Sequence, residues 1–342
     1  MYPDQSPPHF ERRFLAGEYV PMGEIQSPRD WYPISLNTQG IWWRYLRGCQ
    51  FQEPFFQDSL MAQPRAERRI CLRPWSVLRL WAEEVECVPP AAFIFHISRC
   101  GSTLITQMLA SSPANIGISE PPVLDAFFRH SFAHPEMENS PQSFRALIQL
   151  LGQRRGEHSR HLFVKCDSWH IPWIPFVRSV FPFTPVILLY REPAAVLASH
   201  QRQRGPQMVP GLVDTSRLKV HGEPTSGFDL DLYCLMMLKA MLESALHHAE
   251  QSQVILFTYR QLVEGHFPIL LQNLGLEYET QELRLMQERS RFHSKQGRSL
   301  FGGDPPPIPR DLSTPVEELL HHTMRLFENL ETKRRDQQQG QS

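Results

Sequence analysis

The stretch Phe93-Ile-Phe-His-Ile-Ser-Arg-Cys-Gly-Ser-Thr-Leu104 decides how the rest of the sequence is interpreted. It begins as an apolar run typical of a buried β-strand, passes a single glycine with flanking hydroxyl residues, and continues into an amphipathic helix. A tight turn that leads into a helix N-terminus directs several unpaired N–H groups and the positive end of the helix dipole to one place. Gly101 allows close approach of the backbone, and Arg99 adds a full charge. The stretch therefore predicts an anion-binding loop.

The predicted loop runs from Ser98 to Thr103 and offers six candidate phosphate contacts, namely Ser98, Arg99, Cys100, Gly101, Ser102 and Thr103. A plain N-capped turn between a strand and a helix is one alternative interpretation. A nucleoside-triphosphate loop is another, but the Gly-Lys-Ser/Thr ending of that motif is absent. Such an enzyme also needs an acidic magnesium ligand at a strand end, for which Asp167 is the only fair candidate.

From Ala91 onward, short apolar runs alternate with helical patterns, which indicates parallel strands joined by crossover helices. The predicted strands are Phe93–Ile97, Leu162–Cys166, Val186–Tyr190 and Val254–Thr258, with a weaker one at Asn115–Ser119. The predicted helices are Thr103–Ser111, Pro141–Arg154, Ala194–Arg204 and Phe228–Glu250. The expected fold class is α/β, with a central parallel sheet and flanking helices.

Three segments lie outside this pattern. Residues 1–90 hold five of the seven tryptophans and many prolines without strong periodicity, so we expect an irregular, aromatic-rich N-terminal cap. Residues 205–227 are rich in Gly and Pro and are expected to form a loop. The polar segment 333–342 is expected to be a disordered tail. The α/β domain is then expected to span residues 91–332.

The composition excludes some partners. The 35 Lys and Arg residues nearly balance the 36 Asp and Glu residues, so no overall field attracts nucleic acid or an anionic membrane. The six cysteines are scattered, without zinc-ligand spacing or a disulfide framework, which favours free thiols in a reducing compartment. Since neither a secretory signal nor a run of about 18 apolar residues is visible, we expect a cytoplasmic protein.

A second candidate anion site lies in Val186-Ile-Leu-Leu-Tyr-Arg-Glu-Pro-Ala-Ala-Val-Leu-Ala-Ser199. Arg191 leaves the carboxyl end of a predicted strand, and Ser199 follows eight residues later, two turns into the next helix. Both side chains can therefore reach one phosphate. The alternative is a surface arginine beside a helix that starts at Pro193.

Together the two segments resemble the sulfotransferase superfamily, whose donor is 3′-phosphoadenosine 5′-phosphosulfate (PAPS). The stretch from Arg99 is similar to the family's 5′-phosphosulfate loop, with a cysteine where serine is usual, and Arg191 with Ser199 is similar to its 3′-phosphate site. The strand that ends before Tyr259 resembles a later family segment in which the tyrosine lies near the nucleotide, although Arg260 and Gln261 replace its usual acidic residue. The resemblance covers roughly residues 91–300. It implies a P-loop-like sulfotransferase fold with PAPS as co-substrate.

Sulfuryl transfer requires a base for the acceptor's proton and cations for the charge that develops on the leaving phosphate. Glu120 is the candidate base, and it most resembles the glutamate of the tyrosylprotein sulfotransferases, 21 residues after the loop arginine, Arg99. Capping of the next helix is the alternative role for Glu120. Lys165 ends an apolar strand 26 residues before Arg191, a spacing that the same branch shares, and it would polarise the bridging oxygen. Arg99 can serve both binding and catalysis.

Three further predictions concern the surroundings of this site. Ser294 and Lys295 resemble the serine and lysine of a late family loop that closes over the nucleotide, although a solvated charge run is the alternative. His96 and His200 flank the two anion loops and are substitute bases if Glu120 is only structural. No histidine lies at metal-ligand spacing beyond the pair His247-His248, and the donor needs no metal to leave, so no metal is expected.

The sequence therefore predicts an enzyme that moves a sulfuryl group from PAPS to an acceptor hydroxyl or amine, without nucleic acid or membrane partners. The first alternative is a P-loop nucleotide-dependent phosphotransferase or kinase, which would require magnesium and ATP. The second is a non-catalytic nucleotide-binding relative. Arg99, Glu120, Lys165, Arg191 and Ser199 are present together, and this favours an enzyme over the non-catalytic relative.

Overall fold

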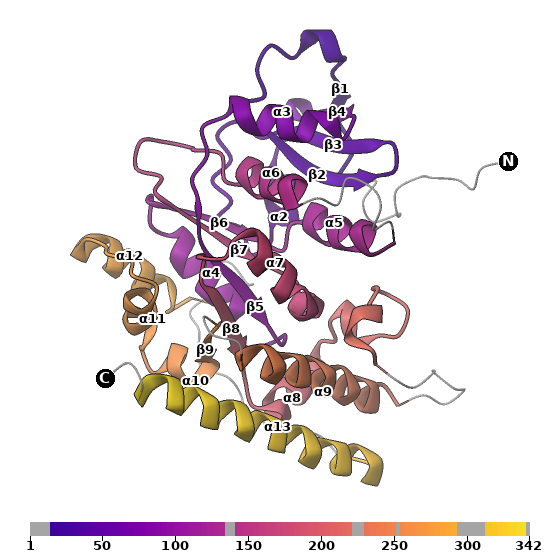
Figure 1. Cartoon of the computed structure of the whole chain (residues 1–342), viewed down its shortest axis with the longest axis vertical. Helices are drawn as coiled ribbons and strands as arrows, with labels where there is room; N and C mark the ends of the chain where they lie inside the picture. The colour runs from indigo at the N-terminus through magenta and orange to yellow at the C-terminus, as the bar shows by residue number, and fades with distance from the viewer. Residues whose placement is uncertain (1–13, 134–140, 221–228, 251–253, 293–311, 340–342) are drawn as a thin grey trace, which may run out of the picture.

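In the computed structural model, which describes residues 14–133, 141–220, 229–250, 254–292 and 312–339, a five-stranded sheet lies at the centre (Figure 1). Its order is β6-β7-β5-β8-β9, and each neighbouring pair is parallel. The strands are β5 (Pro90–His96), β6 (Asn115–Ser119), β7 (His161–Lys165), β8 (Val186–Tyr190) and β9 (Val254–Thr258). The five predicted strands and the α/β class are confirmed.

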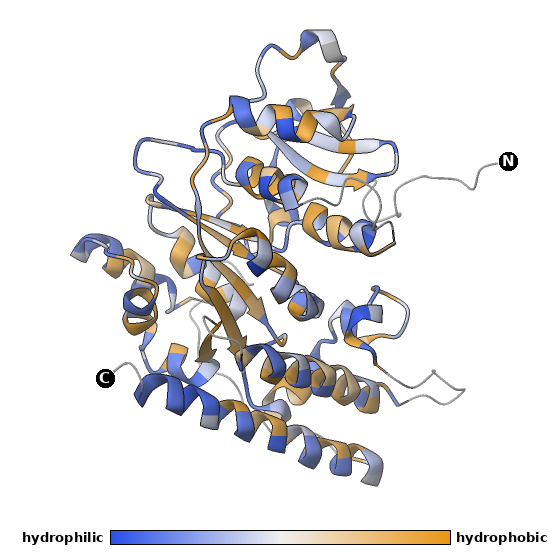
Figure 2. Ribbon diagram, viewed as in Figure 1, coloured by the Kyte–Doolittle hydropathy of each residue, from blue (hydrophilic) through white to orange (hydrophobic). Residues whose placement is uncertain are grey.

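The strands appear in the sequence as continuous apolar runs because helices cover both faces of the sheet. All residues of β6 and of β8 are buried, and Figure 2 shows the strands as a hydrophobic centre. The helices are α4 (Ser102–Ala110), α5 (Pro122–Ala133), α6 (Pro141–Leu151), α7 (Ile174–Val180), α8 (Pro193–Arg202), α9 (Leu230–Ala249), α10 (Tyr259–Val263), α11 (Phe267–Asn273), α12 (Thr280–Arg289) and α13 (Thr314–Gln339). The four predicted helices are confirmed as α4, α6, α8 and α9, with ends shifted by at most three residues.

Three short 3₁₀ helices complete the central part of the chain, namely η3 (Ser168–Trp173), η4 (Pro206–Met208) and η5 (Ser216–Leu218). The last two lie in the segment 205–227 that was expected to be a loop, of which residues 221–227 lie outside the described residues. Short 3₁₀ turns are common in connecting segments. The expectation of an irregular connection therefore holds for most of residues 205–220.

The winding of the sheet reverses between β5 and β8. The chain leaves β5 toward β6 on one side and leaves β8 toward β9 on the other. In open parallel sheets, ligands bind outside the carboxyl ends of the strands at such a switch point. The loop after β5 carries residues 98–101, and Arg191 directly follows β8. The two predicted anion loops are therefore neighbours at one edge of the sheet.

The prediction of an irregular N-terminal cap is wrong. Residues 18–84 contain a four-stranded sheet of order β1-β4-β3-β2 with accompanying helices. Its elements are β1 (Glu18–Tyr19), η1 (Met22–Glu24), β2 (Trp31–Asn37), β3 (Gly40–Tyr45), α2 (Phe56–Ala62), η2 (Arg65–Glu67), β4 (Arg69–Arg73) and α3 (Ser76–Glu84). Almost every residue of β2 is buried. Alternation of apolar and polar residues in β2 is limited to Ile34–Asn37, and Pro33 within the strand disfavours a strand, so the local pattern predicted none.

This N-terminal layer packs against α5 and α6 and shares one hydrophobic core with the central sheet. Gln153 joins the two, since its side-chain oxygen accepts from the Asp30 N–H at 2.9 Å and its amide donates to the Trp31 carbonyl at 2.7 Å. Trp43 contacts Trp81 edge-on, with ring centroids 4.6 Å apart. These tryptophans therefore serve packing.

Helix α13 extends through most of the segment that was expected to be a disordered tail, which corrects that prediction up to Gln339. It packs along α9 (Figure 1) and buries Val316, Thr323 and Leu330, while its other face is polar. The polar composition of residues 333–342 concealed a helix that is held by tertiary contacts on one face only. Among the described residues, no helix combines the length and the apolar character that crossing a bilayer requires.

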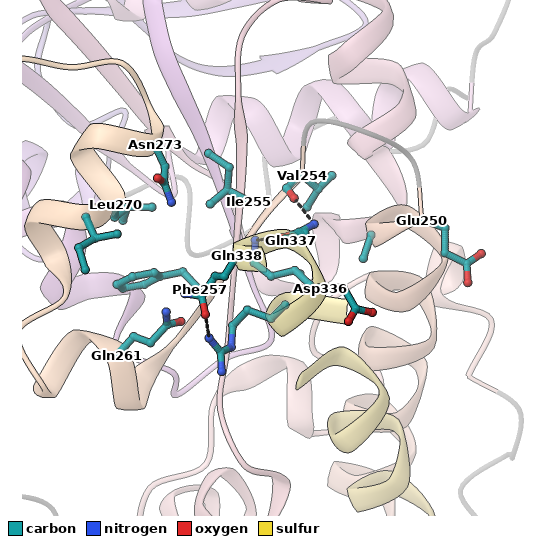
Figure 3. Close-up of a pocket in the computed structure, with 14 residues that line it drawn as sticks. Glu250, Val254, Ile255, Phe257, Gln261, Leu270, Asn273, Asp336, Gln337 and Gln338 are labelled. Carbon is teal, nitrogen blue, oxygen red and sulfur yellow. Dashed lines mark hydrogen bonds between the residues drawn. The ribbon is translucent and has the colours of Figure 1, made fainter. Parts of the chain in front are cut away.

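The end of α13 covers the open edge of the central sheet (Figure 3). Strand β9 is the last strand, so its outer N–H and C=O groups have no strand neighbour. The Gln337 amide donates to the Val254 carbonyl at 2.9 Å, and the Gln337 oxygen accepts from the Leu256 N–H at 3.3 Å. One side chain thus hydrogen-bonds two backbone groups of the edge strand.

Replacing Gln337 with Ala is expected to destabilise the folded protein by about 1 kcal/mol, because two buried backbone groups of β9 lose their partner. The measurement is the midpoint of urea unfolding. Gln287→Ala, on the exposed face of α12, is the matched control and should leave the midpoint unchanged. Equal midpoints for the two variants would show that α13 does not complete the edge of the sheet.

Candidate active site

The loop between β5 and α4 holds three residues in the left-handed region of φ. The φ angles are 74° at Ser98, 48° at Arg99 and 82° at Gly101, the residue that directly precedes α4. Non-glycine residues in this region cost on the order of 1 kcal/mol each, and such strain gathers at ligand sites. A Cβ atom on Gly101 would lie 2.8 Å from Cδ2 of Tyr259. The loop therefore requires glycine at this position both for its conformation and for the close approach of Tyr259.

Two of the predicted phosphate contacts point their side chains into the protein. The Ser98 hydroxyl lies 3.2 Å from Nε2 of His200 and accepts a hydrogen bond from the Gln207 amide at 2.9 Å. The Cys100 thiol is fully buried and donates to the Leu189 carbonyl at 3.5 Å, and burial raises its pKa to about 11. These side chains stabilise the loop, so the contribution of Ser98 and Cys100 to a ligand is limited to their backbone groups.

The other hydroxyl residues lie on the two helices of this edge. Ser102 and Thr103 form the first turn of α4, and each is 5% exposed. The Thr106 hydroxyl donates to the Ser102 carbonyl at 2.9 Å and fixes this turn. Ser199 is half-buried near the end of α8. A helix N-terminus with two small hydroxyl residues and unpaired N–H groups is suited to an anion.

Two arginines and a tyrosine converge on the loop. The Arg191 guanidinium lies 4.1 Å from the ring centroid of Tyr259 and donates to the Arg99 carbonyl at 3.4 Å. The Arg99 guanidinium donates to the Gln203 carbonyl at 2.5 Å, and burial, with the neighbouring charge of Arg202, lowers its pKa. Cations gathered in a partly desolvated place favour a bound anion.

Glu120 and Lys165 form a buried ion pair on the neighbouring strands. Glu120 follows β6 with a φ of 50°, and its N–H donates to the Lys165 carbonyl at 2.8 Å. The Lys165 ammonium, which is fully buried, binds the Glu120 carboxylate. Nε2 of His96 lies 3.2 Å from the same carboxylate oxygen, and the ring of Phe55 lies 5.2 Å from the ammonium. The structure therefore brings the predicted base and the predicted catalytic lysine together.

The carboxyl of Asp167 is hydrogen-bonded to Glu120, and the pKa values of the two groups shift in opposite directions. Burial alone would raise the pKa of Glu120, but Lys165 and His96 outweigh it and hold the pKa well below its usual range. Burial, with the charges of Glu120 and Asp125, raises the pKa of Asp167 well above its usual range. These opposite shifts favour a proton on Asp167 over one on Glu120, and a protonated Asp167 can donate to the Glu120 carboxylate.

The hydrogen bonds define the tautomers of His96 and His200. Nδ1 of His96 accepts from the Ser98 N–H at 3.1 Å, so Nε2 carries the proton that points to Glu120. Nδ1 of His200 accepts from the Gly205 N–H at 3.2 Å, so Nε2 donates to Ser98. Both rings are almost completely buried. Each histidine therefore orients a neighbour and presents no lone pair to an acceptor, which disfavours their role as substitute bases.

Asp125, Asp167 and His170 each place one potential ligand atom within 4.8 Å of the others, a spacing that suits a metal ion. Hydrogen bonds already engage these atoms. Nδ1 of His170 accepts from the Asp167 N–H at 3.1 Å, and Nε2 donates to Asp125 at 2.9 Å. Trp169 and Arg129 each donate to the Asp125 carboxylate at 2.7 Å. The potential ligand atoms of His170 and Asp125 are therefore engaged by protein donors and acceptors in this structure.

Sequence reasoning missed the contributions of Asp167 and Phe55. The position of Asp167, two residues after Lys165 at the carboxyl end of a predicted strand, could have indicated its place in the site. Phe55 gave no signal, because its contact joins residues that lie 110 positions apart (165 − 55). The predicted contacts Ser294 and Lys295 lie outside the described residues.

No protein-family model matches the chain, and no curated protein sequence matches it. A solved structure of the sulfotransferase domain from the curacin biosynthetic pathway is 17% identical, with a TM-score of 0.40 over 69% of this chain and 98% of that one. A sulfotransferase from Mycobacterium avium is 13% identical, with a TM-score of 0.43 over 73% and 78%. Retinol dehydratase in complex with androsterone and the inactive cofactor PAP is 11% identical, with a TM-score of 0.33 over 76% and 85%. At TM-scores this low, the likeness decides nothing about function, which depends on the site itself.

Replacing Gly101 with Ala is expected to lower the Tm, because the new Cβ would clash with Tyr259 and hold a strained φ, together costing about 1–3 kcal/mol. Gly156→Ala is the matched control, since nothing lies within 4 Å of its Cβ position. Thermal unfolding followed by circular dichroism measures both variants. If the two variants unfold at the same temperature, the loop does not need the left-handed glycine.

Proposed function

We propose that this protein is a PAPS-dependent sulfotransferase that transfers a sulfuryl group to an acceptor hydroxyl or amine. The observation that carries this function is the buried Lys165–Glu120 pair, which lies at the sheet edge where the strained loop and Arg191 meet. The pair combines a cation for a leaving oxygen with a carboxylate for a proton, and sulfuryl transfer requires both.

The anion sites favour PAPS over a nucleoside triphosphate. PAPS supplies an activated sulfuryl group and carries phosphates at two separate positions, whereas a triphosphate carries its phosphates in one chain. Two distinct cationic elements match the first arrangement, namely the loop with the N-terminus of α4 and the Arg191 guanidinium held over Tyr259. Ser199 can add a hydroxyl beside Arg191.

Lys165 and Glu120 neutralise each other in the structure, which makes Glu120 a weak base. In the proposed reaction, the ammonium of Lys165 shifts to the negative charge that develops on the leaving phosphate oxygen. Glu120 then loses a cationic neighbour, and its basicity rises when the acceptor's proton must be removed. His96 and Asp167 hold the carboxylate in place by hydrogen bonds throughout. The proton from the acceptor passes to Glu120.

The nucleotide product of the proposed reaction, 3′-phosphoadenosine 5′-phosphate (PAP), is expected to raise the Tm, because a ligand of the native state stabilises it by mass action. ATP with magnesium should raise the Tm much less. Arg191→Ala should remove most of the PAP shift, while Arg79→Ala, on the exposed face of α3, should retain it. A larger Tm shift with ATP and magnesium than with PAP would overturn the proposed donor.

Replacing Glu120 with Gln is expected to lower turnover by roughly 10²–10⁴ while PAP affinity stays nearly unchanged, since amide replacement removes basicity and keeps most hydrogen bonds. The acceptor is identified by incubating the protein with radiolabelled PAPS and a cell extract and analysing the labelled products. The turnover assay then uses an acceptor that is an aliphatic alcohol, because an acidic phenol loses its proton without a base. Glu84→Gln, on the exposed face of α3, is the control. Near-normal turnover of Glu120→Gln with this alcohol would exclude Glu120 as the base.

A further inference from the structure

A cavity of about 820 Å³ lies between α9 and the segment around η5. Its volume is within the range of small-molecule sites. No residue of the phosphate loop and none of the Glu120 network lines it. Helix η3 lies between the cavity and the Glu120 network. Asp167 directly precedes the first residue of η3, and the ring of its last residue, Trp173, contacts Arg217 at the cavity. Six residues of 3₁₀ helix span roughly 12 Å. The cavity is therefore distinct from the proposed sulfuryl-transfer site.

Two cations, Arg217 and Lys219, lie at the mouth of the cavity. The Arg217 guanidinium lies 4.8 Å from the ring centroid of Trp173 and 5.0 Å from that of Phe132, and these rings hold its position. In the part of the chain that the structure describes, neither Arg217 nor Lys219 forms an ion pair. Lys239, on the wall, is neutralised by Glu243 at 2.7 Å. Two cations thus remain for a ligand, and one of them is oriented in advance.

One face of α9 forms the wall of the cavity and combines apolar groups with one unsatisfied polar atom. Met236 and Ala240 supply apolar surface, and the buried Leu218 supplies more from η5. His248, further along the same face, is 5% exposed, and its Nδ1 has no hydrogen-bond partner among the described residues. Burial, with the neighbouring His247, lowers the pKa of His248 to about 4, so the ring is neutral at physiological pH. A buried polar atom without a partner is costly, and a ligand that reaches it removes this cost.

We propose that this cavity binds a small organic anion whose carboxylate or sulfonate lies at Arg217 and Lys219 and whose apolar or aromatic body packs along α9 toward His248. An inorganic anion would leave the apolar wall uncovered, and an uncharged apolar compound would leave the oriented guanidinium unpaired. The cavity combines cations with an apolar wall, so it favours ligands that carry both an anionic group and an apolar body. The sulfotransferase activity proposed above is not required for this binding.

The probe for the experiment is 8-anilinonaphthalene-1-sulfonate, a sulfonate with an aromatic body whose fluorescence reports binding. The titration is carried out on the full chain with saturating PAP, which occupies the proposed nucleotide site. Two compounds test the contributions of the sulfonate and of the rings to binding. N-phenyl-1-naphthylamine lacks the sulfonate, and inorganic sulfate lacks the rings. We expect one saturable site for the sulfonate and at least about tenfold weaker binding of the uncharged amine. Inorganic sulfate should compete only weakly.

Arg217→Gln is expected to weaken the sulfonate probe about tenfold, whereas Arg79→Gln, on the exposed face of α3, should bind as the unchanged protein does. His248→Leu should also weaken the probe and raise the Tm, because the substitution removes an unpaired buried nitrogen. Equal affinities of the Arg217 and Arg79 variants would overturn the proposed site, as would equal binding of the sulfonate and the uncharged amine. A His248 variant that gains stability but binds the probe normally would show that the ligand does not reach His248.

Discussion

The buried ion pair between Lys165 and Glu120 is the constraint on which the arrangement of the site depends. A fully buried ammonium is costly unless it is paired and hydrogen-bonded, and removing one partner would leave an uncompensated charge in the core. The surrounding groups all serve this pair. His96 and Asp167 donate to the carboxylate, and the face of Phe55 lies against the ammonium. A charged centre is thus kept in a place where water is largely excluded, and electrostatic effects on a reaction are strongest there.

The same centre extends into a chain of hydrogen-bonded groups that reaches away from the ligand edge. Asp167 connects Glu120 to His170, and His170 donates to Asp125, which Trp169 and Arg129 also bind. Because these side chains are joined by hydrogen bonds, the network restricts the orientation of Glu120. It also shifts pKa values. The pKa of Asp167 is raised and that of Glu120 is lowered, so the two neighbouring carboxyls differ in their tendency to hold a proton.

The N-terminal layer and the two anion loops show how distant parts of the chain serve one edge of the sheet. The layer closes the side of Lys165 with Phe55, and Gln153 ties it to the central domain. The loop before α4 stores backbone strain at Ser98 and Arg99, and the contacts of Ser98 with His200 and Gln207 hold this conformation. Contacts with the rest of the fold therefore maintain the strained backbone of this loop in a conformation suited to an anion.

The sequence by itself determined the central strands, four helices and the place of both anion loops, because buried parallel strands are continuous apolar runs and their carboxyl ends share one edge. It also indicated Glu120 and Lys165 through their positions at strand ends. Only the tertiary structure decided that these two residues pair, that burial beside Glu120 raises the pKa of Asp167 and that Phe55 covers the lysine. The β-strands of the first ninety residues and the helix through Gln339 also escaped prediction. The reasons are physical: Pro33 within β2 disfavours a strand in the local pattern, and α13 is held by tertiary contacts on one face of a polar helix. Ion pairs, pKa values and edge contacts arise between residues far apart in the chain, where local pattern carries no information.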